Sequence, residues 1–149
     1  MNLVNLNDVE LIEAGTAGGP IRVAFPLHSG TGTASTATVL FELEPGAALG
    51  THTDSAEELL LILEGEGEAH VGDEHGRVRA GDLALVPAMA PHGIRNVGET
   101  TLRVLGFFSS STVVSIFDEF VGPEGEDINV IGGTAPIFAR TAERSALAV

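Results

Sequence analysis

The sequence contains no cysteine and no lysine, and each absence excludes a class of chemistry. Without cysteine, the chain cannot form a disulfide, attack a substrate through a thiolate or bind zinc through sulfur. All seven basic residues are arginine, so Schiff-base chemistry on a lysine amine is also excluded. Tyrosine and tryptophan are missing too, which removes the phenolic acid used in much carbonyl chemistry. Imidazole, carboxylate, hydroxyl and a bound metal or cofactor remain for chemistry.

Long apolar runs and positive charge are also scarce. No apolar run approaches the roughly 20 residues needed to cross a bilayer, and the first residues lack the basic and apolar regions of a secretory signal. Twenty-one acidic residues against seven basic ones give a formal charge of -14, which opposes binding to nucleic acid or to an anionic membrane. We therefore expect a single-domain cytoplasmic protein that binds neither nucleic acid nor membrane.

Glycine and proline divide the chain into short segments rich in Val, Leu, Ile, Thr and Phe. No stretch keeps a 3.6-residue apolar period over three turns, so the fold is expected to be all-β. Alternating apolar residues predict a strand over residues 36–44, and a run that is apolar on both faces predicts a strand over 58–64 buried between two layers. Further strands are expected over residues 68–71, 77–80, 83–86, 101–108 and 113–121. Their regular spacing is typical of a sandwich or closed barrel.

Turn chemistry and the C-terminal region complete the predicted organisation. Residues 72–76 are expected to form a turn, and the strands over 77–80 and 83–86 are expected to pair with each other across a two-residue turn. A polar turn is predicted over residues 122–127. Residues 134–149 are predicted to form either a short terminal helix or a tail that lies on a neighbouring subunit.

Four residues with ligand side chains could meet at one point. His52 and Asp54 are two residues apart, so on an extended chain they project to the same face, about 6.6 Å apart. Glu58 has the same parity and begins the strand over 58–64, where an unpaired carboxylate would be costly to bury. His92 follows two prolines that place a turn at a strand end. Two imidazoles and two carboxylates could thus close on one point, where a cation or a hydrogen-bonded partner would offset the cost of burial.

These residues lie in two spaced motifs. The first reads Gly46, His52, Asp54, Glu58 and Gly65. The second reads Gly81, Pro87, Met89, His92 and Asn96. In composition and spacing they resemble the two motifs of the cupin superfamily, and the fifteen residues between them are similar to the short intermotif segment of small bacterial cupins. The resemblance covers residues 46–96 directly.

Two positions depart from the cupin pattern. Met89 stands where the family has glycine, at a position that governs turn geometry more than ligation. Asp54 replaces the second histidine of the usual set of three histidines and one glutamate. A carboxylate is a legitimate hard ligand, and His-x-Asp with a distal histidine is also the facial triad of many non-haem iron oxygenases built on the same barrel. Asp54 is therefore either a ligand or a partner that orients a histidine.

The resemblance implies a fold, a domain and a site. It implies an all-β, single-domain cupin over residues 1–149, a double-stranded β-helix or jelly-roll barrel at about 36–108, with N- and C-terminal extensions, the latter over 109–149. The implied ligands of a divalent transition metal, Fe(II), Mn(II), Ni(II) or Zn(II), are His52, Asp54, Glu58 and His92. Candidate residues of the substrate pocket are Phe41, Leu60, Ile62, Leu85, Arg95 and Arg103. The alternative is that the buried polar groups are hydrogen-bonded in a barrel that binds no metal.

Several functions fit this ligand set. We expect a metal-dependent enzyme acting on a small chelating substrate, preferably an oxygenase, with Glu58 or Asp54 as the general base when not ligated. One alternative is a redox-neutral isomerase, cyclase or lyase, and another is a non-catalytic cupin that binds a small molecule. A further variant is a 2-oxoglutarate-dependent oxygenase in which Arg103 holds the cosubstrate carboxylate. The resemblance also implies a homodimer, in which residues 1–25 and 110–149 are candidates to cover the barrel edges.

Overall fold

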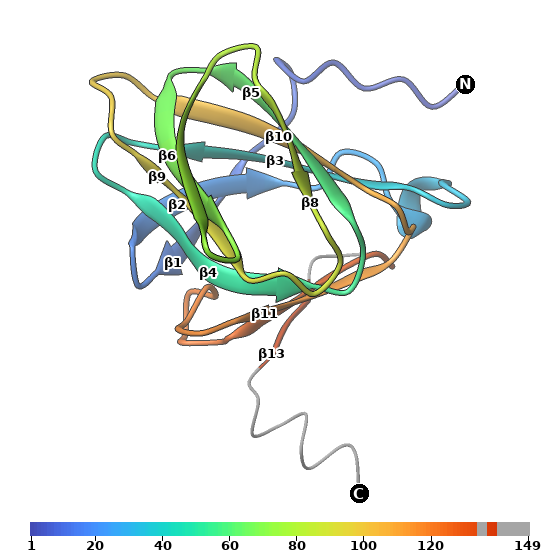
Figure 1. Cartoon of the computed structure of the whole chain (residues 1–149). Helices are drawn as coiled ribbons and strands as arrows, with labels where there is room; N and C mark the ends of the chain where they lie inside the picture. The colour runs from blue at the N-terminus through green and yellow to red at the C-terminus, as the bar shows by residue number, and fades with distance from the viewer. Residues whose placement is uncertain (134–136, 140–149) are drawn as a thin grey trace, which may run out of the picture.

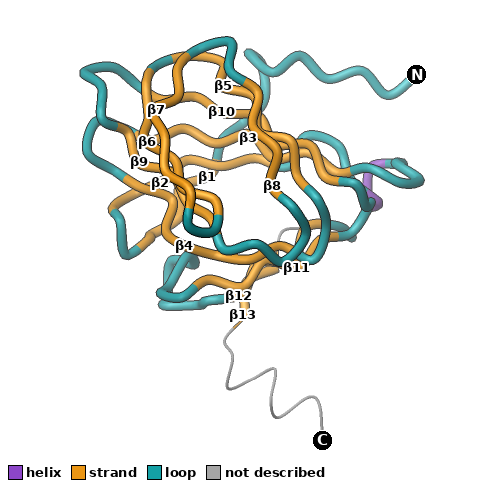
Figure 2. The backbone as a smooth tube through the Cα atoms, in the orientation of Figure 1, coloured by secondary structure: helices purple, strands orange, loops and turns teal. Residues whose placement is uncertain are grey.

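The computed structural model describes residues 1–133 and 137–139. Two antiparallel sheets face each other and curl into a barrel, which confirms the predicted all-β jelly roll (Figure 1). A short 3-10 helix, η1 (Ser29–Thr31), is the only helix within the described residues, and strands joined by loops make up the rest of the barrel (Figure 2). No helix in this part of the chain is long and apolar enough to cross a membrane.

Six strands form the first sheet and seven form the second. In spatial order the first sheet contains β1 (Ile12–Thr16), β2 (Gly19–Ala24), β3 (Ala37–Leu43), β10 (Leu102–Phe108), β5 (Glu58–Glu64) and β8 (Leu83–Val86). The second sheet contains β13 (Ile137–Ala139), β12 (Ile128–Ile131), β11 (Val113–Phe117), β4 (Ala48–Asp54), β9 (His92–Asn96), β6 (Glu66–Val71) and β7 (Glu74–Arg79). From β3 to β6 and from β7 to β11 the chain crosses to the other sheet at every connection, so both sheets contribute side chains to one interior.

The hydrophobic core lies between the two sheets. In β3 the alternate residues Ala37, Phe41 and Leu43 are buried, as the alternation over 36–44 predicted. Leu102 and Val104 of the neighbouring strand β10 are buried in the same cluster. This packing fixes the strands on which the polar residues of the interior are carried.

Strand β5 occupies the predicted residues 58–64, but the prediction that both of its faces are buried was wrong. Leu60 and Ile62 face the core, whereas Leu59 on the opposite face is 38% exposed. The reason is the position of β5, which lies beside the edge strand β8. No further layer of the described chain buries Leu59.

The predicted pairing between the strands over 77–80 and 83–86 was also wrong. Strand β7 pairs with β6 in the second sheet, and β8 pairs with β5 in the first. Between them Gly81 has a φ of +94°, and the carboxylate of Asp82 accepts a hydrogen bond from the backbone of Arg79. These residues turn the chain from one sheet to the other instead of closing a hairpin. The predicted turn over 72–76 shortens to two residues because β7 begins at Glu74.

Strands outside the motifs were harder to predict. Strands β1, β2 and β12 were not predicted. Strand β11 ends at Phe117, earlier than the predicted strand over 113–121. The polar turn over 122–127 is confirmed. The predicted helix or tail over 134–149 lies outside the described residues, apart from 137–139, which form β13. These outer strands are hydrogen-bonded into the two sheets, and the predicted barrel limits of 36–108 stay a prediction.

Candidate metal centre

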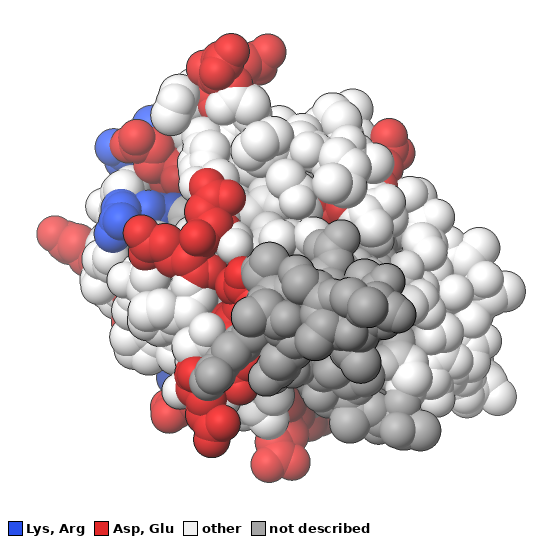
Figure 3. Space-filling model, turned by 90° about the horizontal axis from the view of Figure 1, so that it is seen from below, with Lys and Arg blue, Asp and Glu red and all other residues white. Residues whose placement is uncertain are grey.

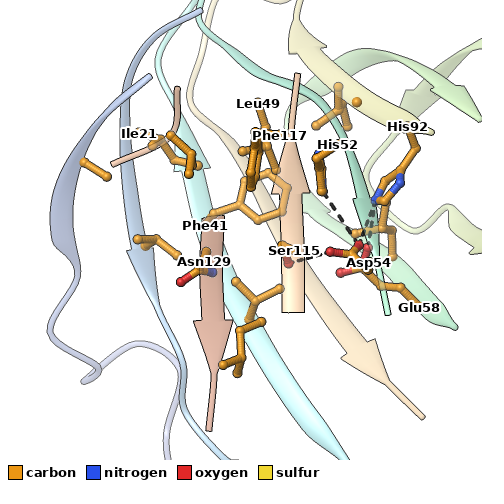
Figure 4. A pocket seen from close by; sticks show the side chains of 18 of the residues that line it. Ile21, Phe41, Leu49, His52, Asp54, Glu58, His92, Ser115, Phe117 and Asn129 are labelled. Carbon is orange, nitrogen blue, oxygen red and sulfur yellow. Dashed lines mark hydrogen bonds and ion pairs between the residues drawn. The ribbon is translucent and has the colours of Figure 1, made fainter. Parts of the chain in front are cut away.

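Three of the four predicted ligands lie on two neighbouring strands. His52 and Asp54 are on β4, and the register places His52 directly opposite His92 on β9. Because alternate residues of a strand face the same side, Asp54 projects to the same side as His52. Glu58 begins β5 in the other sheet, so it approaches the group from across the barrel (Figure 4). All four residues are buried, with exposures between 2% and 5%.

The ligand atoms of these residues converge. Nε2 of His92 lies 3.1 Å from Oδ2 of Asp54 and 3.3 Å from Oε1 of Glu58. Nε2 of His52 lies 3.7 Å from the same Asp54 oxygen. Ligand atoms of His52, Asp54 and His92 all lie within 4.8 Å of one another, as required for bonds of about 2.0–2.2 Å to a common ion. Glu58 stands outside this three-residue set, and its role as a ligand stays a prediction.

Both imidazoles are oriented by backbone carbonyl groups. Nδ1 of His52 lies 2.8 Å from the carbonyl oxygen of Gly50, and Nδ1 of His92 lies 2.9 Å from that of Ala90. Because a carbonyl oxygen only accepts, Nδ1 carries the proton and donates in each case. In the neutral tautomer Nε2 is then left with its lone pair directed at the site. This is the usual arrangement of a metal-binding histidine.

Two buried atoms at the meeting point lack hydrogen bonds. Among the described residues, neither Oδ2 of Asp54 nor Nε2 of His92 has a hydrogen-bond partner, although the two atoms face each other at 3.1 Å. The other Asp54 oxygen, Oδ1, accepts a hydrogen bond of 2.5 Å from Ser115. The two atoms form an ion pair when His92 is protonated, but with a neutral His92 both are acceptors, and a proton or a cation has to lie between them. A cation between the two atoms would satisfy both, so these residues fit a metal ion.

Burial and neighbouring charges shift the pKa values of the site. Burial and the positive charge of His92 lower the pKa of His52 to about 4. Burial alone would lower the pKa of His92, but the Asp54 and Glu58 carboxylates outweigh it and raise that pKa to about 10. Burial raises the pKa of Glu58 to about 7. Burial also opposes ionisation of Asp54, yet its interactions with His92, His52 and Ser115 lower its pKa overall. At neutral pH His92 must therefore lose a proton before it can bind a metal.

The site opens into a cavity inside the barrel. Its volume is about 60 Å³, which is room for roughly four or five water molecules. Phe117 of β11 stacks on the His52 imidazole, with ring centroids 4.3 Å apart and planes inclined by 13°. Figure 4 shows the histidines and carboxylates at one side of the cavity and Asn129 at the other, with Phe41 and Phe117 between them. The cavity thus has an ionisable end and a neutral end.

Comparison with known proteins gives the family. A cupin-domain family model matches residues 39–108, which include all four predicted ligands. The chain belongs to the cupin superfamily. The uncharacterized protein MJ1618 of Methanocaldococcus jannaschii is 37% identical to this cupin over 51 residues, which make up 34% of the cupin and 41% of that protein. The cupin therefore matches less than half of the length of this curated relative.

Solved structures share the fold. The oxalate decarboxylase of Lactobacillus farciminis, in a formate complex, is 21% identical to this cupin, with a TM-score of 0.66 over 76% of the cupin and 35% of that chain. A predicted oxalate decarboxylase from Thermotoga maritima is 25% identical, with a TM-score of 0.66 over 72% of the cupin and 98% of that chain. Both likenesses support the jelly-roll architecture. The activities in these names belong to those proteins.

The predicted apolar pocket residues of this cupin divide into two groups. Phe41 and Leu60 line the cavity. Ile62 is buried in the core and does not line it. The prediction was wrong for Leu85, which is 57% exposed because β8 turns Val86 toward the interior instead.

Neither predicted arginine lines the cavity. Arg95 is exposed on the outside of β9, where its guanidinium donates to the carbonyl oxygen of Gly46 at 2.7 Å. The guanidinium of Arg103 donates to the carbonyl oxygen of Leu6 at 2.7 Å and lies 3.6 Å from a carboxylate oxygen of Glu42. Both predictions were wrong because each arginine has outward parity on its strand. The 2-oxoglutarate variant thereby loses the residue that was to hold its cosubstrate.

Three of the cavity residues that the sequence analysis of this cupin missed bear directly on the site. Ser115 and Phe117 come from β11, and Asn129 comes from β12. One signal was present for Ser115, since Val113 and Phe117 alternate with it and all three share a buried face. A polar residue among such positions points to a functional interior. Nothing local indicates that β12 packs beside them.

Proposed function

We propose that this cupin is a metal-dependent enzyme in which His52, Asp54 and His92 hold a divalent transition metal, and that it acts as an oxygenase on a small chelating substrate. The supporting observation is the convergence of three buried side chains, His52, Asp54 and His92, whose ligand atoms lie within 4.8 Å of one another. Two imidazoles and one carboxylate, without sulfur, suit Fe(II), Mn(II), Ni(II) or Zn(II) better than Mg or Ca. The same ligand set is typical of non-haem iron oxygenases.

The residues around the site support this chemistry. A bound metal would supply Lewis acidity and, if redox-active, reactivity toward dioxygen. The chain holds both imidazoles through their Nδ1 hydrogen bonds and Asp54 through Ser115, so all three ligands are oriented. The carboxyl group of Glu58, 3.3 Å from Nε2 of His92, is in position to take and return a substrate proton. The apolar walls limit the access of water to the reacting groups.

Anaerobic reconstitution tests the proposal. Metal-free protein would be loaded with Fe(II), Mn(II), Ni(II) or Zn(II) and assayed for oxygen uptake with hydroxyketones, enediols and catechols. We expect one metal per chain, and oxygen uptake with a redox-active metal. His52→Ala and Asp54→Asn should abolish both, whereas Glu57→Gln, an exposed neighbour outside the cavity, should change neither. A protein that binds none of these metals contradicts the site, and one that binds metal without consuming oxygen contradicts the oxygenase.

A redox-neutral isomerase, cyclase or lyase is the second candidate. The observation that favours it is Glu58, a buried carboxyl group that lines the cavity but stands outside the three-ligand set. Such a group can transfer protons while the metal polarises a substrate oxygen. Product formation without oxygen, lost in Glu58→Gln at unchanged metal affinity, would favour this candidate. Ligand binding without turnover under any condition would instead indicate a non-catalytic cupin.

A further inference from the structure

Asn129 gives the cavity a second polar end. Its side chain lines the cavity and is 8% exposed. Its Oδ1 is buried and accepts no hydrogen bond from any residue that the structure describes. Native proteins seldom keep a buried carbonyl oxygen unpaired, because its lost hydration is not compensated. A ligand that donates a hydrogen bond to this atom would provide that compensation.

Asn129 belongs to a polar row that begins at the metal ligands. Asp54, Ser115 and Asn129 lie directly opposite one another on β4, β11 and β12, so their side chains share the interior face (Figure 4). Ser115 is already hydrogen-bonded to Asp54, but Oδ1 of Asn129 has no hydrogen-bond partner among the described residues. Two strand spacings, about 10 Å, separate the backbones of Asp54 and Asn129. Phe41 and Phe117 lie between the two ends, so the path is apolar.

We infer that Asn129 determines substrate specificity by accepting a hydrogen bond from the end of the substrate that is remote from the metal. The inference rests on the proposed metal site. It assigns the substrate to a class: a short molecule with a chelating group at one end, an apolar body of a few carbons, and a hydroxyl or N–H donor at the other. A cavity of about 60 Å³, roughly four or five water-sized groups, has room for such a short chain. An analogue without the donor is disfavoured because it leaves Oδ1 unpaired.

Two isosteric probes test this role. The probes 4-hydroxybutanohydroxamic acid and pentanohydroxamic acid both chelate metals through the hydroxamate and differ only in a terminal hydroxyl or methyl group. With zinc-loaded protein in a calorimeter, we expect the hydroxyl probe to bind at least about tenfold more tightly. Asn129→Leu should remove or reverse this preference without changing zinc affinity. Val130→Ala, on the opposite face of β12, should preserve it.

A metal-free measurement separates a positioning role from a folding defect. Asn129→Leu removes a buried, unpaired side-chain oxygen from an apolar wall, so the metal-free variant should melt about 2–4 °C above the wild type. Equal affinity for the two probes in the wild type, or an unchanged preference in Asn129→Leu, overturns the inference and leaves the metal site standing. A wild-type protein that binds neither zinc nor Fe(II), Mn(II) or Ni(II) overturns the metal site, and this inference with it.

An independent observation concerns the outside of the six-stranded sheet. An apolar surface, the outer leucine face, is formed by Leu59, Leu61, Leu83, Leu85 and Phe107. The register aligns Phe107, Leu59 and Leu85 in one row and Leu61 with Leu83 in the next. Four of the five, all except Leu61, are between 38% and 62% exposed. The face reaches the edge strand β8, where aggregation or pairing is usually prevented by charge or cover.

We propose that a second copy of this chain covers the outer leucine face. The exposed side chains present on the order of 400 Å² of apolar surface, about half of the ~800 Å² that each partner buries in a standard interface. Met1 and Leu3 are exposed on the N-terminal segment, which Arg103 of β10 holds through the Leu6 carbonyl, and they can add to this area. With a charge of -14, and acidic side chains gathered on one side of the face drawn in Figure 3, two copies repel where such side chains would meet. An uncharged face allows a two-fold contact with itself.

Sedimentation analysis tests this interface. We expect a wild-type dimer, and a dissociation constant raised at least about a hundredfold in the double variant Leu83→Glu, Leu85→Glu. Phe120→Glu, which changes an apolar residue of similar exposure outside the face, should stay dimeric. Unchanged metal affinity in each variant shows that the barrel is folded. A monomeric wild type at tens of micromolar, or a folded double variant that stays dimeric, overturns the proposal.

Discussion

The two ends of the cavity are built by different parts of the chain and differ in charge. Strands β4, β5 and β9 bring two histidines and two acids to one end. Strands β11 and β12 bring neutral side chains to the other end. The ends are nevertheless in contact, because Ser115 donates to Asp54 and Phe117 stacks on His52. The neutral end therefore supports the ligands as well as facing the substrate.

Because one end of the cavity is ionisable and the other neutral, the two ends should differ in how far they tolerate substitution. Ligand atoms must keep their mutual distances to within about 0.5 Å, so the ionisable end tolerates little change. A neutral wall can exchange one side chain for another while the metal site persists. Residues such as Asn129 would then mainly determine which substrate binds, and the ionisable end would determine the type of reaction. Variants at each end of the cavity test this division of roles.

Loss of a ligand should have the largest effect. His52→Gln and His92→Gln each remove one of three converging ligand atoms, so metal affinity should fall by more than the roughly hundredfold typical of outer-shell changes. Asn129→Leu, at the neutral end, should change it by less than about twofold. Competition against a chromophoric chelator measures all three affinities. A His92→Gln protein that binds metal with wild-type affinity would contradict the division of roles between the two ends.

Ser115 should have the next largest effect, because it connects the two ends. Ser115→Ala removes the hydrogen bond that orients the Asp54 carboxylate, and metal affinity should fall about 10- to 100-fold. Ser115→Thr, which keeps the hydroxyl, should recover most of it. Ser110→Ala removes an exposed hydroxyl of the preceding loop and serves as the control. If Ser115→Ala binds metal normally, the neutral end gives no support to the ligands.

A change of pH acts on the ionisable end alone. The raised pKa of His92, about 10, means that a metal must displace its proton at lower pH. Apparent metal affinity should therefore rise about tenfold per unit between pH 7 and 9. Burial raises the pKa of Glu58 to about 7, so below pH 7 the slope should approach about two protons per metal if Glu58 also ligates. A flat profile in non-coordinating buffers would contradict the ligand role of His92.

The same groups give the metal-free protein a pH-dependent stability. The folded-state pKa of His92, about 10, exceeds the ordinary histidine value of 6.5, so its contribution is complete below pH 6.5 and is lost as the pH approaches 10. Glu58, with its pKa raised from 4.5 to about 7, acts in the same direction over its own interval. The pKa of His52, lowered to about 4, has the opposite effect, and its contribution is lost only as the pH falls. The melting temperature should thus fall from pH 7 to 10, and His92→Gln should flatten this slope.

Strand positions followed from local sequence, whereas their pairing did not. The alternation in β3 and the apolar run of β5 located both strands to within a residue. Turn residues such as Gly81 and Asp82 are found both in hairpins and in connections between two sheets, so they do not distinguish the two. Pairing with other strands decides between these two structures, because β7 pairs with β6 and β8 pairs with β5. Such long-range partners leave no local signal.

The same distinction applies to the site. His52 and Asp54 could be predicted to share a face because two residues on one strand have fixed parity. Their meeting with His92 was suggested by the spacing of the two motifs. Asn129 could not be found in this way, since its place in the cavity depends on β11 pairing with β4 and β12 pairing with β11. That its Oδ1 is buried without a hydrogen-bond partner can be recognised only once those pairings are known.

The smallest predicted effect tests whether the position of Glu58 is fixed by a neutral neighbour. Gly106 lies on β10 beside the Glu58 carboxylate, and a Cβ there would clash with its Oε2 and lie 2.8 Å from Cγ1 of Val39. Gly106→Ala should displace the carboxylate and cost about 1–3 kcal/mol of unfolding free energy, while the three-ligand metal affinity changes by less than about tenfold. Gly76→Ala on β7, where a Cβ meets nothing within 4 Å, is the matched control and should stay near wild type. Thermal melts and metal titrations measure both variants. If Gly106→Ala melts like the wild type and keeps Glu58-dependent turnover, then the strand does not fix this acid, and the ionisable end tolerates more change than its charges suggest.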